Sequence, residues 1–140
     1  MAHSGRVIIV SGGCKDGSRD TNEVLQFSLD DHSLEAMTPM KEERFGHSME
    51  IVNQTVYVFG GYGSGSIEML SLAPGSHWQT VDATFPNEVI LSITCQVSPY
   101  LILVAGSFWS EKTVHLFNTR NNSLRKLEDA PIGFNNGWNN

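Results

Sequence analysis

The sequence predicts an all-β protein built from about three similar units, each a four-stranded antiparallel sheet. Three observations support this fold class. Short apolar runs that end in small residues recur along the chain, an alternating polar and apolar segment follows each run, and polar turns separate the segments. Such periodic units are typical of repeat proteins, in which each unit buries its apolar faces against its neighbours.

The apolar runs are the most regular feature. They cover residues 7–10, 56–59 and 101–104. Each run leads to a glycine, and Gly13, Gly61 and Gly106 lie 48 and 45 residues apart. A strand that is apolar without alternation is expected to be covered on both faces. Glycine at its end permits a sharp turn, because glycine adopts positive φ angles without a steric penalty.

Each glycine is followed by an alternating segment, a polar turn and a large apolar residue. The alternating segments are residues 24–29, 67–72 and 114–119. The large residues are Leu34, Trp78 and Leu124, which lie 44 and 46 positions apart. In the second and third copies a further strand, at 47–52 and 92–97, leads through a two-residue turn into the apolar run. A full unit therefore has four strands, a to d.

This pattern resembles the kelch repeat, and the resemblance covers nearly all of the chain. The second copy matches most fully: residues 44–48 resemble the lead into strand a, residues 56–61 the signature strand b, and Trp78 the strand-d tryptophan. The first and third copies have leucine in place of the tryptophan, and the third has Ala105 in place of the first glycine. The resemblance implies kelch-type β-propeller blades.

The repeat register divides the chain into blades. Blade 1 covers residues 1–37, blade 2 covers 38–81 and blade 3 covers 82–127, and 128–140 lead into a further blade. In this register the first blade lacks strand a. Because a propeller needs about four to eight blades, we expect an incomplete propeller. We favour a fragment of a longer chain over a homodimer that completes the ring.

Composition excludes several classes of function. The formal net charge is −6 and no basic stripe occurs, so a nucleic-acid partner is not expected. No run approaches the roughly 18 apolar residues of a membrane span, and the apolar run at the N-terminus is too short for a signal peptide. We therefore expect a cytoplasmic protein. His47, His77 and His115 show no ligand spacing, so neither a metal nor a cofactor is predicted.

The resemblance implies a protein-interaction platform without catalysis, whose protein or peptide partner docks on the face made by the b–c loops and the blade-linking loops. An arginine before strand a binds acidic side chains in cullin-adaptor kelch proteins, and Arg44 matches that position. The alternative is that Arg44 pairs with Glu42, Glu43 or a neighbouring loop. The candidate partner-binding residues are Lys15, Arg19, Arg44, Tyr62, Ser64, Phe108 and Trp109.

Other interpretations stay open beside this one. The aromatic candidates either anchor a partner or fold back over the blade edge. The alternative function is a fragment of a kelch-fold enzyme, a copper oxidase or a sugar-processing enzyme, with its active residues in missing blades. Two burial predictions accompany the fold: Trp78 packs between blades with its indole N–H on a carbonyl, and Cys95 is buried on a strand.

Overall fold

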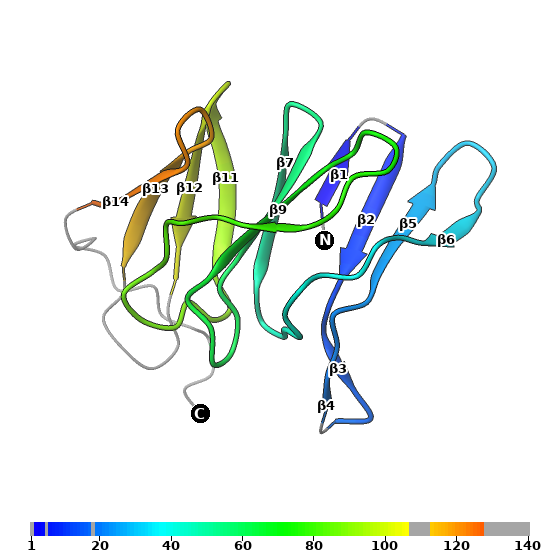
Figure 1. Ribbon diagram of the computed structural model, residues 1–140, viewed down its shortest axis with the longest axis horizontal. Coiled ribbons are helices and arrows are strands. Elements are labelled where there is room, and N and C mark those ends of the chain that lie inside the picture. The colour runs from blue at the N-terminus through cyan, green and yellow to red at the C-terminus, as the bar shows by residue number, and fades with distance from the viewer. Residues whose placement is uncertain (1, 5, 18, 107–112, 128–140) are drawn as a thin grey trace, which may run out of the picture.

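A computed structural model describes residues 2–4, 6–17, 19–106 and 113–127, and this part of the chain is all-β. It forms three four-stranded antiparallel sheets and a two-stranded hairpin. The described residues form no helix, and therefore no helix that could span a membrane. The structure confirms the predicted fold class, with sheets arranged as blades of a partial propeller (Figure 1).

Within each sheet the strands lie side by side in chain order, from strand a to strand d. The first contains β1 (Ala2–Ser4), β2 (Val7–Ser11), β5 (Val24–Ser28) and β6 (Leu34–Ala36). The second contains β7 (Ser48–Val52), β8 (Thr55–Phe59), β9 (Ile67–Ser71) and β10 (Gln79–Thr80). The third contains β11 (Ile93–Ser98), β12 (Leu101–Ala105), β13 (Val114–Asn118) and β14 (Ser123–Lys126). The hairpin of β3 (Cys14–Lys15) and β4 (Arg19–Asp20) occupies the b–c loop of the first sheet.

The first sheet corrects one prediction, because it does contain a strand a. The short strand β1 pairs antiparallel with β2, with Ala2 opposite Ile9 and Ser4 opposite Val7. In the repeat register, residues 2–4 correspond to the last three positions of β7, and these three positions suffice to pair. The prediction that the first blade lacks strand a was therefore wrong.

Strand pairing also corrects the alignment of the glycines. The N–H groups of Gly12, Gly60 and Gly106 bond to the carbonyls just before strand c, so Gly106 and not Ala105 is the equivalent of the first glycine. Gly60 shows why a side chain is excluded there. Its φ is 64°, and a Cβ atom would lie 2.5 Å from the carbonyl oxygen of Val89, in the segment that leads into the third sheet.

The three sheets meet along their first strands. β7 contacts both β1 and β11, and Figure 1 shows the three strands side by side. Hydroxyl groups at the start of β11 join it to the second sheet. Ser92, just before β11, donates to the Ser48 hydroxyl at 2.7 Å, and Thr94 donates to the Met49 carbonyl at 3.0 Å. The sheets therefore fan out from a common line of strands.

Two apolar clusters fill the spaces between the sheets, and β8 contributes to both. Its side chains alternate, so Val56 and Val58 face the first sheet, while Tyr57 and Phe59 face the third. The first cluster contains Ile9, Val24, Met40, Met49, Val56, Val58, Leu70 and Trp78. The second contains Val52, Tyr57, Phe59, Ile67, Val81, Phe85, Val89, Ile102, Val104 and Phe117. Coverage on both faces, predicted for an unbroken apolar strand, is confirmed for β8.

Burial follows the prediction at Trp78 and departs from it at the outer sheets. Trp78 is buried just before β10, and its indole N–H donates to the Thr38 carbonyl at 2.8 Å. On β2, however, Ile9 is buried while Val10 is 40% exposed, so described residues cover only one face of that strand. Cys95 lies on β11 as predicted but is exposed. Its neighbour Thr94 bonds to the second sheet, and successive side chains of a strand alternate between its faces, so Cys95 lies on the opposite face of β11. The prediction that Cys95 is buried was therefore wrong.

Candidate functional site

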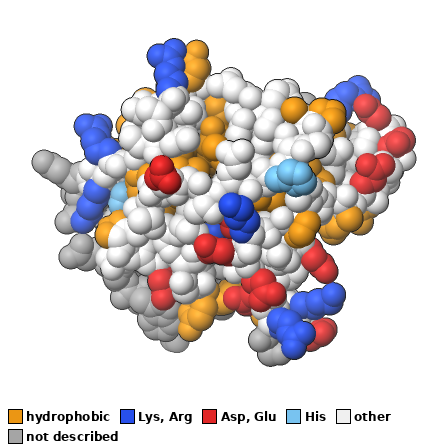
Figure 2. Space-filling view, in the orientation of Figure 1, with side chains coloured by type: hydrophobic (Ala, Val, Ile, Leu, Met, Phe, Trp, Pro, Cys, Tyr) orange, Lys and Arg blue, Asp and Glu red, His pale blue; other side chains and the backbone are white. Residues whose placement is uncertain are grey.

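The loop face of the first two sheets begins with the β3–β4 hairpin. Asp16 and Gly17 turn the chain with φ angles of 56° and 70°, a conformation that aspartate and glycine tolerate best. The hairpin carries Lys15 and Arg19, two of the predicted partner-binding residues, and both side chains are exposed. Figure 2 shows basic and acidic side chains gathered over this hairpin, at the lower right of the face.

An aromatic ledge of Tyr62 and Phe45 lies on the same face. Tyr62 follows the glycine pair of the second sheet, and its backbone N–H donates to the Phe45 carbonyl at 3.0 Å. The two rings stack with centroids 5.0 Å apart and an angle of 26° between their planes. Tyr62 nevertheless stays 54% exposed. One side of its ring is therefore anchored on the blade, and the rest is open to a partner.

A groove of about 470 Å³ lies between the hairpin and the aromatic ledge. Its lining is Cys14, Gly17, Arg19, Asp20, Glu43, Phe45 and Tyr62. The groove thus brings together Arg19 and Tyr62, which are 43 residues apart in the chain. An aromatic ledge beside charges of both signs is the chemistry of a polar interaction surface, with a place for one apolar anchor.

Arg44 lies between groove residues Glu43 and Phe45 but is itself fully buried, with 0% exposure. Its Nη1 donates to the Gly60 carbonyl at 2.6 Å and to the Ser66 carbonyl at 3.2 Å. Its Nη2 donates to carboxylate oxygens of Glu68 at 2.9 Å and Glu42 at 3.2 Å. The ion pair with Glu42, which the sequence left open as the alternative, is present. In this conformation the guanidinium has no exposed surface.

Glu68 is the functional neighbour that sequence reasoning missed. This residue of β9 is fully buried, and its carboxylate accepts the backbone N–H groups of Lys41 at 2.8 Å and Glu42 at 3.1 Å as well as the guanidinium of Arg44. The available signal was a charged residue inside strand c, where strand pairing places Leu25 and His115 in the other two sheets. A buried carboxylate of this kind needs a cationic partner.

Ser64 and Glu42 complete the cluster around Arg44. The Ser64 and Ser66 hydroxyls each donate to the Glu42 carboxylate at 2.9 Å. Partial burial opposes ionisation of Glu42, but these hydrogen bonds and the charge of Arg44 outweigh it, so the pKa of Glu42 lies below its ordinary value. Ser64, a predicted partner-binding residue, is therefore occupied within the protein and connects the b–c loop to the blade-linking loop.

The remaining predicted residues and the histidines are placed as follows. Lys15 lies 3.7 Å from the carboxylate of Glu23, an exposed pair of small energetic weight. Phe108 and Trp109 lie outside the described residues. His47 hydrogen-bonds to Ser11 at 2.9 Å, and His115 is buried against Phe85. Within the described ranges, no group of three His, Cys, Asp or Glu side chains is arranged to hold a metal ion.

Comparison with known proteins gives a distant relative and no family assignment. No protein-family model matches the sequence. Over 125 residues, which cover 89% of the chain, it is 22% identical to a putative F-box/kelch-repeat protein of Arabidopsis thaliana. The chain spans about a third (34%) of the length of that relative. The similarity agrees with the kelch-like pattern of the repeats.

Proposed function

We propose that this chain is a protein-interaction platform that binds a protein or peptide on its loop face and carries no catalysis of its own. The observation on which the proposal rests is the half-exposed Tyr62, stacked on Phe45 at the wall of the groove. An aromatic side chain that is anchored and still exposed is typical of interaction hot spots, because it loses little conformational freedom on binding.

The groove suggests the kind of partner. Arg19 supplies a planar donor group, while Asp20 and Glu43 supply carboxylates on the same lining. A partner that places an apolar side chain against the aromatic ledge, with charges of both signs around it, would fit this arrangement. The exposed Lys15 extends the basic part of the surface along the hairpin.

In this proposal, Arg44 and Ser64 position the face and do not contact the partner. Their cluster ties the blade-linking loop, through Glu42, to the b–c loop, through Ser64 and Ser66. Phe45 and Tyr62 belong to these same two loops. A rigid connection beneath the ledge reduces the ordering that binding would otherwise require.

The distant relative suggests a wider context. Its name combines an F-box with kelch repeats, and this chain corresponds to about a third of it. We therefore propose that the chain serves as a substrate-recognition or scaffold part of a larger protein. The similarity supports the interaction class and leaves the partner to be identified by experiment.

The test compares three variants in partner capture and in direct binding. Tyr62→Ala and Arg19→Glu are expected to weaken binding of a captured and then purified partner by about tenfold or more. Tyr100→Ala is the matched control, since Tyr100 is 38% exposed in the a–b turn at the other end of the third sheet. A partner that binds all three variants with wild-type affinity would refute the loop-face proposal.

A further inference from the structure

A second cavity, of about 520 Å³, lies between the second and third sheets and is separate from the loop-face groove. It is formed at the opposite end of the strands, where strand a turns into b and strand c turns into d. Thr55 at the start of β8 and Gly75 in the β9–β10 turn contribute from the second sheet. Thr119 and Asn122 contribute from the β13–β14 turn of the third sheet. Two adjacent blades therefore suffice to form this cavity.

The lining of this cavity is rich in hydroxyl groups, and its titratable side chains are the phenol of Tyr57 and the imidazole of His77. It includes Thr55, Ser71, Ser76 and Thr119 and contains no Asp, Glu, Lys or Arg. Burial raises the pKa of the Tyr57 phenol, so this group also stays uncharged at neutral pH. A charged ligand would lose hydration here without a carboxylate, ammonium or guanidinium group to pair with, whereas the hydroxyl groups of a neutral ligand would exchange hydrogen bonds to water for hydrogen bonds to the lining.

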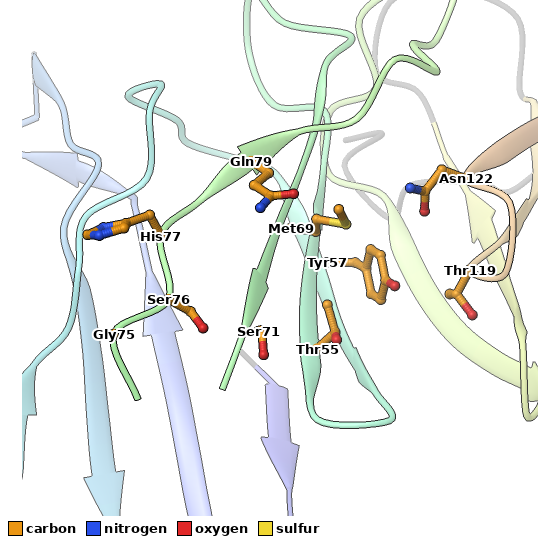
Figure 3. A pocket seen from close by; sticks show the side chains of 10 residues that line it. All are labelled: Thr55, Tyr57, Met69, Ser71, Gly75, Ser76, His77, Gln79, Thr119 and Asn122. Atoms are coloured by element: carbon orange, nitrogen blue, oxygen red, sulfur yellow. The ribbon is translucent and has the colours of Figure 1, made fainter. Parts of the chain in front are cut away.

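Two side-chain amides lie on opposite walls. Gln79 comes from β10 of the second sheet and Asn122 from the third, and Figure 3 shows them on either side of Tyr57. Neither amide makes a side-chain hydrogen bond within the part of the chain that the structure describes. Each amide offers a donor and an acceptor in one plane, which suits a pair of neighbouring hydroxyl groups.

Tyr57 provides an aromatic surface between these walls. It is 95% buried, and its ring meets Phe117 edge-on at 5.5 Å and stacks with Phe59 at 6.4 Å. Figure 3 shows the side chain projecting from β8 toward Thr119 and Asn122. The ring is therefore held in place by the apolar cluster behind it, with its polar end toward the cavity.

Backbone contacts hold the rim in a defined shape. The side-chain amide of Asn53 donates to the Pro99 carbonyl at 3.1 Å and joins the a–b turns of the two sheets. The Leu72 N–H donates to the Gln54 backbone carbonyl at 2.8 Å, and the Thr119 N–H donates to the Tyr100 backbone carbonyl at 2.9 Å. These bonds connect each c–d turn to the a–b turn beside it, so much of the cavity is preformed before any ligand binds.

We propose that this cavity binds a neutral saccharide unit. Ring hydroxyls of a sugar can pair with the amides of Gln79 and Asn122 and with the surrounding hydroxyls, while its apolar C–H face rests near Tyr57. The volume lies within the range of small-molecule sites. Donors and acceptors that converge from opposite walls suit a compact polyol better than an extended peptide. The proposal does not depend on the loop-face function.

The test uses four neutral disaccharides as probes: maltose, cellobiose, lactose and N,N′-diacetylchitobiose. Saturation-transfer-difference NMR followed by calorimetry is expected to show binding of at least one. Gln79→Ala and Asn122→Gly should each weaken it by about tenfold, the loss of one well-formed hydrogen-bonding group. Glycine is chosen at position 122 because Asn122 has a φ of 53°.

Two controls separate this site from general surface effects. Gln96→Ala removes an exposed glutamine of β11 that lies outside the cavity, and Tyr62→Ala alters the loop face; both should leave saccharide affinity unchanged. Circular dichroism establishes that each variant is folded. The proposal is overturned if no probe binds up to about 10 mM, or if binding survives both cavity variants. It is also overturned if a blocked alanine tripeptide binds there and the sugars do not.

Discussion

Adjacent sheets meet at two joints. The first joint lies between the first and second sheets, and the second joint lies between the second and third sheets. The two joints share a backbone contact but differ in their side chains. In the first joint the Gly13 N–H donates to the Arg44 carbonyl at 2.7 Å, and in the second the Gly61 N–H donates to the Val89 carbonyl at 3.0 Å. The residues that supply these carbonyls are a buried arginine in one case and a buried valine in the other.

The side chains around the two contacts differ as well. The first joint includes polar bonds, such as the one between Ser11 and His47 and the one from the indole of Trp78 to Thr38, in the segment that links the two sheets. The second joint also has polar bonds, from Ser92 and Thr94 to β7, but its apolar filling is a cluster of rings. In this cluster Phe117 meets both Tyr57 and Phe59 edge-on at about 5.5 Å. The comparison shows that the repeat conserves backbone geometry while the chemistry that fills it varies.

The largest effect is expected at the first joint on truncation of Trp78. Trp78→Ala removes a buried ring and its hydrogen bond, and we expect the free energy of unfolding to fall by about 3–5 kcal/mol. Leu34 is the matched control, because it takes the place of the tryptophan in the first sheet but is 61% exposed. Urea denaturation measures both variants. A similar loss for Leu34→Ala and Trp78→Ala would contradict the assigned role of the first joint.

The buried ion pair should come next. Arg44→Met leaves the Glu68 carboxylate buried without its cation, and we expect a loss of about 3 kcal/mol. The loss is at the low end of the range for broken buried pairs because Glu68 still accepts two backbone N–H groups. The Arg44→Met/Glu68→Leu double variant should recover only part of it, because leucine removes the unpaired charge but leaves the N–H groups of Lys41 and Glu42 without their acceptor.

The exposed pair of Lys15 and Glu23 gives the control for this prediction. Lys15→Met should change the free energy of unfolding by at most about 0.5 kcal/mol, because exposed pairs are screened by water. If Arg44→Met were as mild as Lys15→Met in the same urea titration, the cluster around Arg44 would not hold the loops together.

A smaller effect than those at Trp78 and Arg44 is the pH dependence of the free energy of unfolding that His47 contributes at the first joint. Burial, together with the nearby charge of Arg44, lowers the pKa of His47 from 6.5 to about 4. The unfolded chain therefore binds a proton at higher pH than the folded chain does. Stability contributed by neutral His47 is complete above pH 6.5 and is lost as the pH falls toward 4, by about 2 kcal/mol.

Urea denaturation at pH 7 and pH 4.5 measures this effect. His115 and the carboxylates also contribute to acid sensitivity, so the wild type is compared with His47→Gln, which keeps a side chain able to bond to Ser11. The loss between the two pH values should be smaller in His47→Gln. Equal losses in the two proteins would rule out His47 as the acid-sensitive group of this joint.

The sequence allowed the strands to be predicted because their signals are local. Alternation, apolar runs and turn residues located the second and third sheets to within a residue or two. The Trp78 contact was predictable for the same reason, as a large ring in a regular register needs a neighbouring sheet. The first strand was missed because three residues, Ala2–Ser4, are too few to show a pattern.

The arrangement of the loop face was only partly predictable. Sequence reasoning selected Tyr62 and Arg19 as candidates and left open two interpretations of Tyr62, and in the structure the ring both stacks on its blade and remains exposed. It did not select Glu68, because the ion pair of this β9 residue with Arg44 forms only when the blade-linking loop packs against β9.

The sequence by itself determined the repeat, the strand order within the second and third sheets and the all-β class, because these depend on spacing and side-chain periodicity along the chain. Tertiary structure alone decided that Arg44 is buried with Glu68, that Tyr62 and Arg19 share a groove, and that Gln79 and Asn122 face one cavity. These outcomes depend on contacts between residues 24 to 43 positions apart. Burial and neighbouring charge are properties of the folded arrangement, and no local pattern in the chain records them.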